Sequence, residues 1–273
     1  MRSLNIYSRG GCIRILGAAC MAAVFLAQSG AGAKEPTPDA KAILMRMADF
    51  LSKSPRMSVT VHGSYDALQA EGDKVEWNDV REIALSRPDR LRINTQRSDG
   101  ARSLLVFDGK EITTFDESSK AYAQASHPGS VDNAVVYFVR DLGMRLPLAV
   151  LLTTRLPAEL GQRVQSVEYV EKTATLSAPA HHIAGKTATV DFQLWIADGD
   201  RPAPLRAVLT YKEAPGQPQF RAQFSDWNFD SRLPDSAFTF TPPEGAKKIP
   251  FAAALPGIPL GPGGMPVKKG GKR

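Results

Sequence analysis

The stretch VDFQLWI at residues 190–196 decides the fold class. Every second residue in it is apolar, and Asp191, Gln193 and Trp195 stand between. Successive side chains of a β-strand point to opposite faces, so this alternation places Phe192 and Leu194 on one common face. The stretch therefore predicts a strand that turns one apolar face toward a protein interior.

The same period of two recurs along most of the chain. The turn signal Asp108-Gly109 joins two such runs, because glycine accepts the positive φ that tight hairpins need. Short polar connections between consecutive strands favour antiparallel pairing, since parallel strands need long crossovers. Strands are predicted at 57–65, 75–86, 89–96, 103–107, 110–115, 120–124, 165–171, 181–185, 189–197, 205–212 and 219–229.

A sheet of about ten strands is too large to stay flat, because strand twist makes it curl. A curled sheet of that size encloses more volume than its own side chains fill. Residues 40–51 and 130–142 show the 3.6-residue period of amphipathic helices, and Pro147 and Pro157 bracket an uncharged apolar stretch at 148–152. We expect these segments to cover the open side of the sheet.

The two ends of the chain differ from its body. Residues 1–33 combine three arginines, an apolar run and the small-x-small pattern Ala31-Gly32-Ala33, which is typical of a cleaved secretory signal peptide. An uncut anchor helix and lipidation at Cys20 are the alternatives. A linker is predicted at 34–37, one domain at 38–249, and a disordered basic tail rich in proline and glycine at 250–273. Both cysteines, Cys12 and Cys20, lie in the first segment, so the mature chain has no thiol.

Charge excludes one class of partner. The chain has a formal net charge of +6, but residues 1–33 and 247–273 carry basic residues and no acidic ones. The body between them is therefore slightly acidic, and no nucleic acid is expected to bind it. The basic tail could touch an anionic membrane lipid, or it could serve solubility alone.

The polar residues do not form a recognisable catalytic or metal-binding motif. His181 and His182 are adjacent on a strand, so their rings point to opposite faces and cannot chelate one ion together. Ser126 and His127 are neighbours in a turn, without the Gly-x-Ser-x-Gly pattern of a hydrolase. The sequence predicts no enzyme, no metal site and no cofactor.

Three short motifs then give a resemblance. DFQLWI at 191–196, QFSDW at 223–227 and AFTFTPPEGA at 237–246 together resemble a family of predicted periplasmic proteins of unknown function. That family is similar in outline to the LolA/LolB-like carriers and receptors of lipoproteins. The resemblance implies a half-open antiparallel β-barrel of about eleven strands with helices covering its mouth. It also implies a cavity for acyl chains and an arginine that holds the closed state, a role that could not be assigned to Arg81, Arg90 or Arg92.

The sequence thus predicts a periplasmic, non-catalytic carrier or chaperone for an apolar ligand such as an acyl chain, a lipid or a lipoprotein anchor. The alternatives are a protein-interaction or envelope-stress sensor module of the same fold and an unrecognised hydrolase. A membrane or protein partner is possible, and a monomer is expected. Residues predicted to line the cavity are Val61, Tyr65, Leu91, Ile93, Val106, Phe192, Leu194, Leu209, Tyr211, Phe220 and Phe224. Residues predicted to form its lid are Val135, Phe138, Val139, Leu142, Leu148 and Leu151.

Overall fold

The computed structural model describes residues 37–142 and 146–251. The expected signal segment, most of the expected linker and residues 252–273 of the expected tail lie outside this part. The helical elements are α1 (Ala40–Lys53), α2 (Val131–Arg140), η1 (Ala149–Leu152), α3 (Leu156–Arg163) and η2 (Asp235–Phe238). The strands are β1 (Arg56–Leu68), β2 (Lys74–Ser86), β3 (Arg90–Arg97), β4 (Arg102–Phe107), β5 (Glu111–Asp116), β6 (Ala121–Ser126), β7 (Ser166–Thr173), β8 (Ala180–Lys186), β9 (Val190–Ala197), β10 (Pro204–Tyr211), β11 (Gln219–Asn228) and β12 (Lys247–Lys248).

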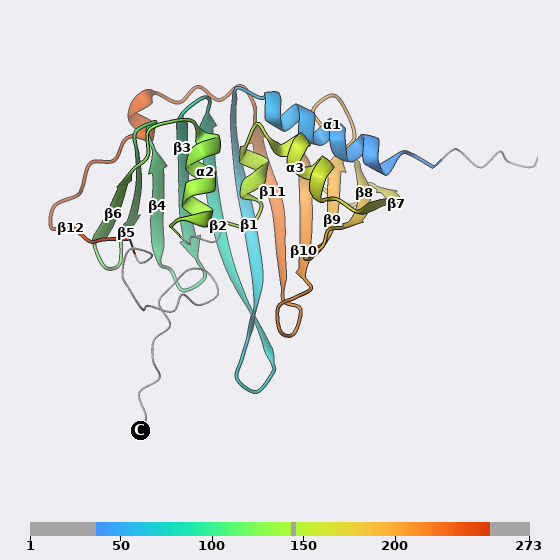
Figure 1. The fold of residues 1–273 in the computed structure, drawn as a ribbon, viewed down its shortest axis with the longest axis horizontal. Helices are drawn as coiled ribbons and strands as arrows, with labels where there is room; N and C mark the ends of the chain where they lie inside the picture. Colours follow the sequence, from blue (N-terminus) through green and yellow to red (C-terminus); the bar gives the residue numbers. More distant parts are fainter. Residues whose placement is uncertain (1–36, 143–145, 252–273) are drawn as a thin grey trace, which may run out of the picture. The chain divides into compact units, whose positions relative to one another are not determined.

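All described strands belong to one 12-stranded sheet, in the order β12-β6-β5-β4-β3-β2-β1-β11-β10-β9-β8-β7 (Figure 1). Two meanders, β1–β6 and β7–β11, are joined where β1 pairs antiparallel with β11. Among these strands only β12 pairs in parallel, with β6. The two outermost strands, β12 and β7, do not pair with each other, so the sheet is an unclosed barrel, which confirms the predicted fold class.

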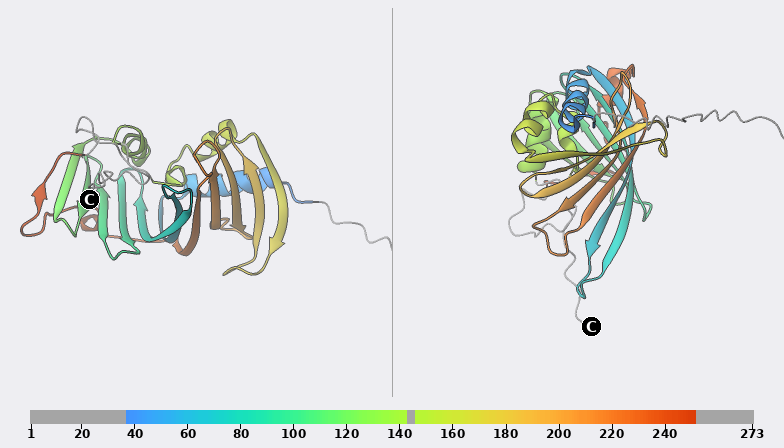
Figure 2. Two further views of the ribbon diagram at one scale, coloured as in Figure 1. Left: turned by 90° about the horizontal axis from the view of Figure 1, so that it is seen from below. Right: turned by 90° about the vertical axis from the view of Figure 1, so that its right-hand side faces the viewer.

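Helical elements α1, α2, η1 and α3 cover one face of this sheet, which we call the inner face (Figure 2). Strand alternation gives that face Met57, Val59 and Val61 of β1, and these residues share one buried cluster with α1, α2 and η1. The opposite, outer face carries the intervening residues. The apolar positions of the two-residue period in the sequence therefore face the core, and the positions between them face the exterior.

Local sequence explains where the covering helices begin. The carboxylate of Asp39 accepts hydrogen bonds from the main-chain N–H groups of Lys41 (2.9 Å) and Ala42 (3.1 Å) and so caps α1. Ser130 caps α2 in the same way through the N–H of Asn133. The buried residues of α1 include Leu44, Met47 and Leu51, which lie on one side of the helix.

The chain after β11 crosses to the outer face. There η2 buries Phe238, and the guanidinium of Arg92 donates a hydrogen bond to the main-chain oxygen of Ala237 at 3.0 Å. Phe240 then packs against Phe115 and Tyr122, with ring centroids 5.5 Å apart in both cases. This C-terminal arm (235–243) therefore covers part of the outer face of β3–β6.

Candidate functional site

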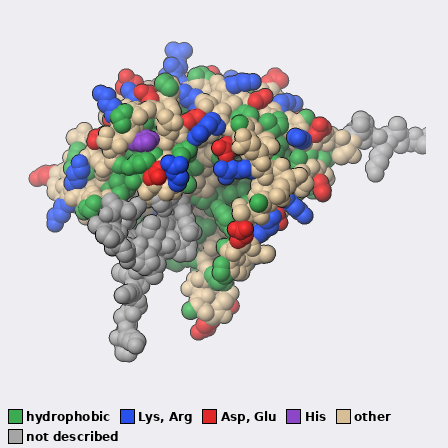
Figure 3. All heavy atoms as spheres, viewed as in Figure 1, with side chains coloured by type: hydrophobic (Ala, Val, Ile, Leu, Met, Phe, Trp, Pro, Cys, Tyr) green, Lys and Arg blue, Asp and Glu red, His purple; other side chains and the backbone are tan. Residues whose placement is uncertain are grey.

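A small apolar cavity lies between the inner face and the helical cover. Its volume is about 30 Å³. Figure 3 shows hydrophobic side chains gathered on this side of the molecule, below the cover and above the projecting β1–β2 hairpin. The cavity is lined by Met57, Val59, Val61, Arg81, Ile83, Leu146, Pro147, Leu148, Ala149, Leu151, Leu152, Phe220, Phe224 and Trp227.

The short segment 146–152 fills most of the space. Leu151 and Leu152 of η1 are 7% and 5% exposed, and both face the cavity. Leu148 precedes them with φ of 64°, a left-handed conformation that is uncommon for leucine. A cavity of about 30 Å³ holds a water molecule or two, whereas ligand pockets measure about 300–1,000 Å³. The large hollow expected from the strand count is therefore occupied by the protein's own residues, which we call the plug (146–152).

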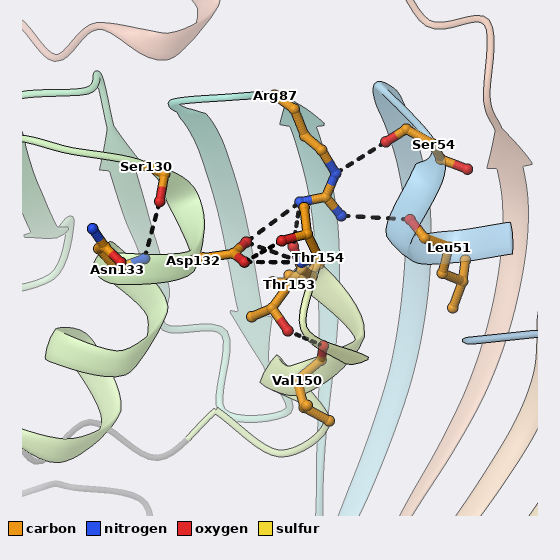
Figure 4. A network of polar contacts seen from close by, with 10 residues as sticks. Leu51, Ser54, Arg87, Ser130, Asp132, Asn133, Val150, Thr153 and Thr154 are labelled. Atoms are coloured by element: carbon orange, nitrogen blue, oxygen red, sulfur yellow. Dashed lines mark hydrogen bonds and ion pairs between the residues drawn. The ribbon is translucent and has the colours of Figure 1, made fainter. Parts of the chain in front are cut away.

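Arg87, just after β2, connects three parts of the cover (Figure 4). Its guanidinium donates hydrogen bonds to the main-chain oxygens of Ser54 at 3.0 Å, Leu152 at 3.0 Å and Leu51 at 3.4 Å. These acceptors lie at the end of α1 and at the end of the plug. One arginine thus donates to carbonyl groups at the ends of two helices, where intrahelical donors become scarce.

The same guanidinium forms an ion pair with Asp132 of α2, 3.7 Å away. Asp132 in turn accepts hydrogen bonds from the main-chain N–H and the hydroxyl of Thr154. Burial lowers the pKa of Arg87, and the charge of Asp132 acts in the opposite direction. Arginine stays protonated in proteins, so the contact is a charged link between the sheet, α1, α2 and the plug.

A second buried arginine, Arg81, lies on the inner face of β2 and lines the cavity. Its guanidinium contacts the carboxylate of Asp79 at 2.5 Å, and the side chains of the two residues are 12% and 6% exposed. The Arg81 guanidinium also lies 5.9 Å from the centroid of the Phe220 ring. The apolar cavity therefore has the cation of a charged pair at one edge.

The structure brings together most of the residues predicted for the cavity and lid. Val61, Phe220, Phe224, Leu148 and Leu151 line the cavity itself. A second group is buried in the surrounding core or packed against it: Tyr65, Leu91, Ile93, Phe192, Leu194, Leu209, Tyr211, Val135, Phe138 and Leu142. Their contact with a ligand stays a prediction.

Two predicted residues lie elsewhere. Val106 is buried but faces outward, because its neighbours Leu105 and Phe107 take the inner positions of β4. Val139 of α2 is 42% exposed. The sequence analysis missed Arg87, which is adjacent to Pro88 in a turn, and its partner Asp132. A basic residue between a long strand and a proline was the only signal, and it is a weak one.

A larger groove of about 590 Å³ lies on the outer face, under the C-terminal arm. Charged residues of both signs line it, including Glu82, Arg92, Arg102 and Glu117, together with Phe115 and Phe240. An apolar chain placed there would bury charges without replacing their hydration. Size alone would select this groove, but the chemistry of an apolar ligand selects the inner cavity.

The two adjacent histidines point to opposite faces, as expected. His181 contacts Asp198 at 3.1 Å, while His182 stacks on Trp195 with 4.0 Å between ring centroids. Across residues 37–142 and 146–251, no group of three or more His, Cys, Asp or Glu side chains is placed to hold a metal ion. No helix within those ranges is long and apolar enough to cross a bilayer.

Several solved structures are similar to this chain at low sequence identity. No curated protein sequence matches the chain. An uncharacterized conserved protein from Thermus thermophilus is similar in structure, with 12% identity and a TM-score of 0.45 over 77% of this chain and 98% of that one. The lipoprotein LppX of Mycobacterium tuberculosis gives 14% identity and a TM-score of 0.43 over 71% and 98%. A LolA superfamily protein from Nitrosomonas europaea gives 11% and 0.37 over 74% and 98%.

These structural likenesses concern the fold only. The sequence itself matches a family model described as a predicted periplasmic protein, DUF2092, over residues 40–252. That range begins at α1, ends just beyond the last described residue and includes both the sheet and its helical cover. The chain therefore belongs to the DUF2092 family of predicted periplasmic proteins.

Proposed function

We propose that this protein is a non-catalytic periplasmic carrier that binds an acyl chain between the inner face of its sheet and its helical cover. One observation carries the proposal. The inner face of the sheet is apolar, and the plug, a segment that does not belong to the sheet, covers it. Leu151 and Leu152 occupy the space that a ligand chain would take. The described conformation then corresponds to the closed, ligand-free state of such a carrier.

The free energies allow exchange between plug and ligand. Exposing two buried leucines costs about 3–6 kcal/mol, at about 1.5–3 kcal/mol each. Burying a methylene gains about 0.8 kcal/mol, so about four to eight methylenes offset the displaced plug. Longer chains bind with a net gain and shorter ones do not. A carrier of this kind should therefore show a threshold in acyl chain length.

The contacts of Arg87 stabilise the closed position of the helical cover. Opening the cover separates Arg87 from the carbonyls of Leu51, Ser54 and Leu152, which must then find water. Because the guanidinium and these carbonyls exchange protein partners for water, the net cost of opening stays moderate. A ligand that fills the cavity supplies that cost, and its departure lets the plug return.

The first test is lipid extraction and mass spectrometry of the protein purified from a bacterial periplasm. Co-purified acyl lipid supports the proposal. Titration with saturated acyl amides of increasing length should then show binding only above about eight methylenes, the upper end of the range at ~0.8 kcal/mol each. If no chain of any length binds and no lipid is extracted, the carrier proposal is wrong.

Hydrogen exchange tests the plug directly. The N–H of Leu151 donates to Leu148 at 2.9 Å, and that of Thr153 donates to Val150 at 3.1 Å. Binding usually slows exchange, but a ligand that displaces the plug should speed it at these two amides. The N–H of Ile43, which donates to Asp39 at 3.0 Å in the first turn of α1, serves as the internal control. Slower exchange at Leu151 and Thr153 on binding would place the ligand elsewhere.

A further inference from the structure

The inner face holds an acceptor that no group in the described chain uses. Oδ2 of Asp79 accepts a hydrogen bond from Arg81, at 2.5 Å. The other carboxylate oxygen, Oδ1, is buried and has no hydrogen-bond partner among the described residues. A buried acceptor left in this way costs free energy, because it has lost its water without replacement. Its partner Arg81 lines the cavity, so a ligand that reaches Arg81 comes close to this unused acceptor.

Neighbouring residues make room for this carboxylate. Gly63 of β1 lies directly opposite Asp79 in the register of β1 and β2. A Cβ atom added to Gly63 would lie 2.6 Å from Oδ1 of Asp79 and 3.3 Å from the ring of Phe220. Any side chain at position 63 would therefore push the carboxylate away. Glycine at position 63 therefore leaves the space that Oδ1 of Asp79 occupies.

Arg81 lines the cavity, and Asp79 lies one level further along the inner face, beyond the lining residues. Along the inner face, successive levels of the β1–β2 pairing are Met57 with Leu85, Val59 with Ile83, Val61 with Arg81, Gly63 with Asp79 and Tyr65 with Trp77. The first two levels are apolar, and the charged pair comes next. Four residues of strand span about 13 Å, so the apolar levels give a chain a defined track that ends at the Arg81–Asp79 pair.

We propose that this pair is a head-group subsite for an acyl ligand whose head is uncharged and both donates and accepts hydrogen bonds, as an acyl amide does. This rests on the proposed carrier function. The amide N–H donates to Oδ1 of Asp79, and the amide oxygen accepts from the guanidinium of Arg81. An ester offers no donor and leaves Oδ1 without a partner. A free fatty acid brings a second negative charge beside Asp79.

Three ligands with the same chain separate these heads. Palmitamide, methyl palmitate and palmitate are titrated against the mature protein at about pH 7.5, by displacement of the neutral fluorophore N-phenyl-1-naphthylamine. Palmitamide should bind about tenfold tighter than each of the other two, which corresponds to ~1.4 kcal/mol. If the three affinities agree within about twofold, the subsite is wrong and the carrier proposal stands. If none of the three binds, the carrier proposal itself fails.

The variant Asp79→Asn assigns the preference to this carboxylate. The substitution removes the negative charge, so palmitate should gain about tenfold relative to palmitamide through Arg81. The matched control is Asp66→Asn, on the same hairpin but paired with Arg221 on the outer face. The control should keep the wild-type order of the three ligands. An unchanged order in Asp79→Asn, with the fold intact by circular dichroism, would overturn the assignment, and the wild-type comparison remains decisive if that variant does not fold.

Discussion

Arg81 in the middle of β2 and Arg87 just after its last residue are arginines of equal exposure but with different partners. The side chains of Arg81 and Arg87 are each 12% exposed, and two apolar residues, Ile83 and Leu85, separate them on the inner face. Arg87 contacts main-chain oxygens and a carboxylate that belong to α1, the plug and α2. Arg81 contacts the carboxylate of Asp79, two residues away on its own strand.

This difference separates two roles. The partners of Arg87 come from distant parts of the sequence, so its contacts exist only while the cover is closed. Arg81 and Asp79 belong to one strand, so their contact survives any movement of the cover. We infer that the Arg87 end controls access to the cavity, whereas the Arg81 end stays in place to meet a ligand. Variants of these and neighbouring residues can test the two roles separately.

The largest effect is expected at Arg87. The substitution Arg87→Ala leaves the partly buried carboxylate of Asp132 without its cation and removes three hydrogen bonds to main-chain oxygens, so it should lower the free energy of unfolding by about 3–5 kcal/mol. Urea denaturation measures this change. Hydrogen exchange of the plug amides should rise as well, because the link between the plug and the sheet is lost.

The matched control is Arg140→Ala, which removes an exposed ion pair with Asp141 at the end of α2. Exposed pairs contribute about 0–1 kcal/mol, so this variant should unfold almost as the wild type does. An equal loss in both variants would mean that Arg87 has no special role in the closed state.

A smaller effect is expected when the plug itself is shortened. Leu151→Ala should lower the free energy of unfolding by about 2–5 kcal/mol and enlarge the cavity. The affinity for N-phenyl-1-naphthylamine should rise at the same time, because less of the plug has to be displaced. Fluorescence titration and urea denaturation give the two values.

Leu156→Ala provides the comparison for this variant. Leu156 of α3 is fully buried but does not line the cavity. Its truncation should cost similar stability without any gain in affinity. Tighter binding in both variants would indicate that general loosening, and not the plug, admits the probe.

The next prediction concerns the ion pair between Asp66 and Arg221 on the outer face, whose contribution to stability depends on pH. Burial raises the pKa of Asp66, but hydrogen bonds from Arg221 and from the N–H of Gln219 outweigh it, so the pKa lies below the ordinary 3.8. The carboxylate therefore stabilises the fold above pH 3.8, and this contribution is lost as the pH falls through the lowered folded pKa.

Asp66→Asn should cost about 0.5–1 kcal/mol at neutral pH, in the range of a partly exposed ion pair. The difference between variant and wild type should shrink as the pH falls below 3.8, which urea denaturation across a pH series measures. A difference that stays constant down to about pH 2 would contradict the assigned ion pair.

The sequence predicted the strands and helices because each of them has a clear period. The inner face of β9 was read from residues 190–196 alone, and Phe192 and Leu194 are buried there. Strand β4 was ambiguous, because Leu104, Leu105, Val106 and Phe107 are all apolar. The C-terminal arm covers the outer face of this strand, so apolar residues are accommodated on both sides and alternation carries no signal.

Irregular backbone and contacts between distant residues could not be predicted from the sequence. Asp226 has φ of 56° beside an irregularity in the β1–β11 register, and after it Trp227 turns to the inner face and lines the cavity. A strict period of two would place Trp227 outside, since Phe224 faces in. Arg87 depends on four partners between residues 51 and 152, and no local pattern indicates such a convergence.

The smallest predicted effect concerns Trp77, one level beyond Asp79 on the projecting β1–β2 hairpin. Its side chain is 43% exposed and paired with Tyr65, so Trp77→Ala should change the free energy of unfolding by no more than about 0.5 kcal/mol. An indole has an apolar body and a polar N–H, which suits contact with a ligand head group. Palmitamide should therefore bind about two- to fivefold more weakly, equal to about 0.5–1 kcal/mol.

Trp195→Ala is the control, because that indole lies on the outer face between His182 and Arg206. It should lose stability through the broken stack yet keep its affinity for palmitamide. The two variants thus separate binding from folding. Trp77→Ala should lose affinity and keep its stability, whereas Trp195→Ala should lose stability and keep its affinity. If Trp77→Ala left the affinity unchanged, the charged pair alone would hold the ligand head, and the indole would have no contact with it.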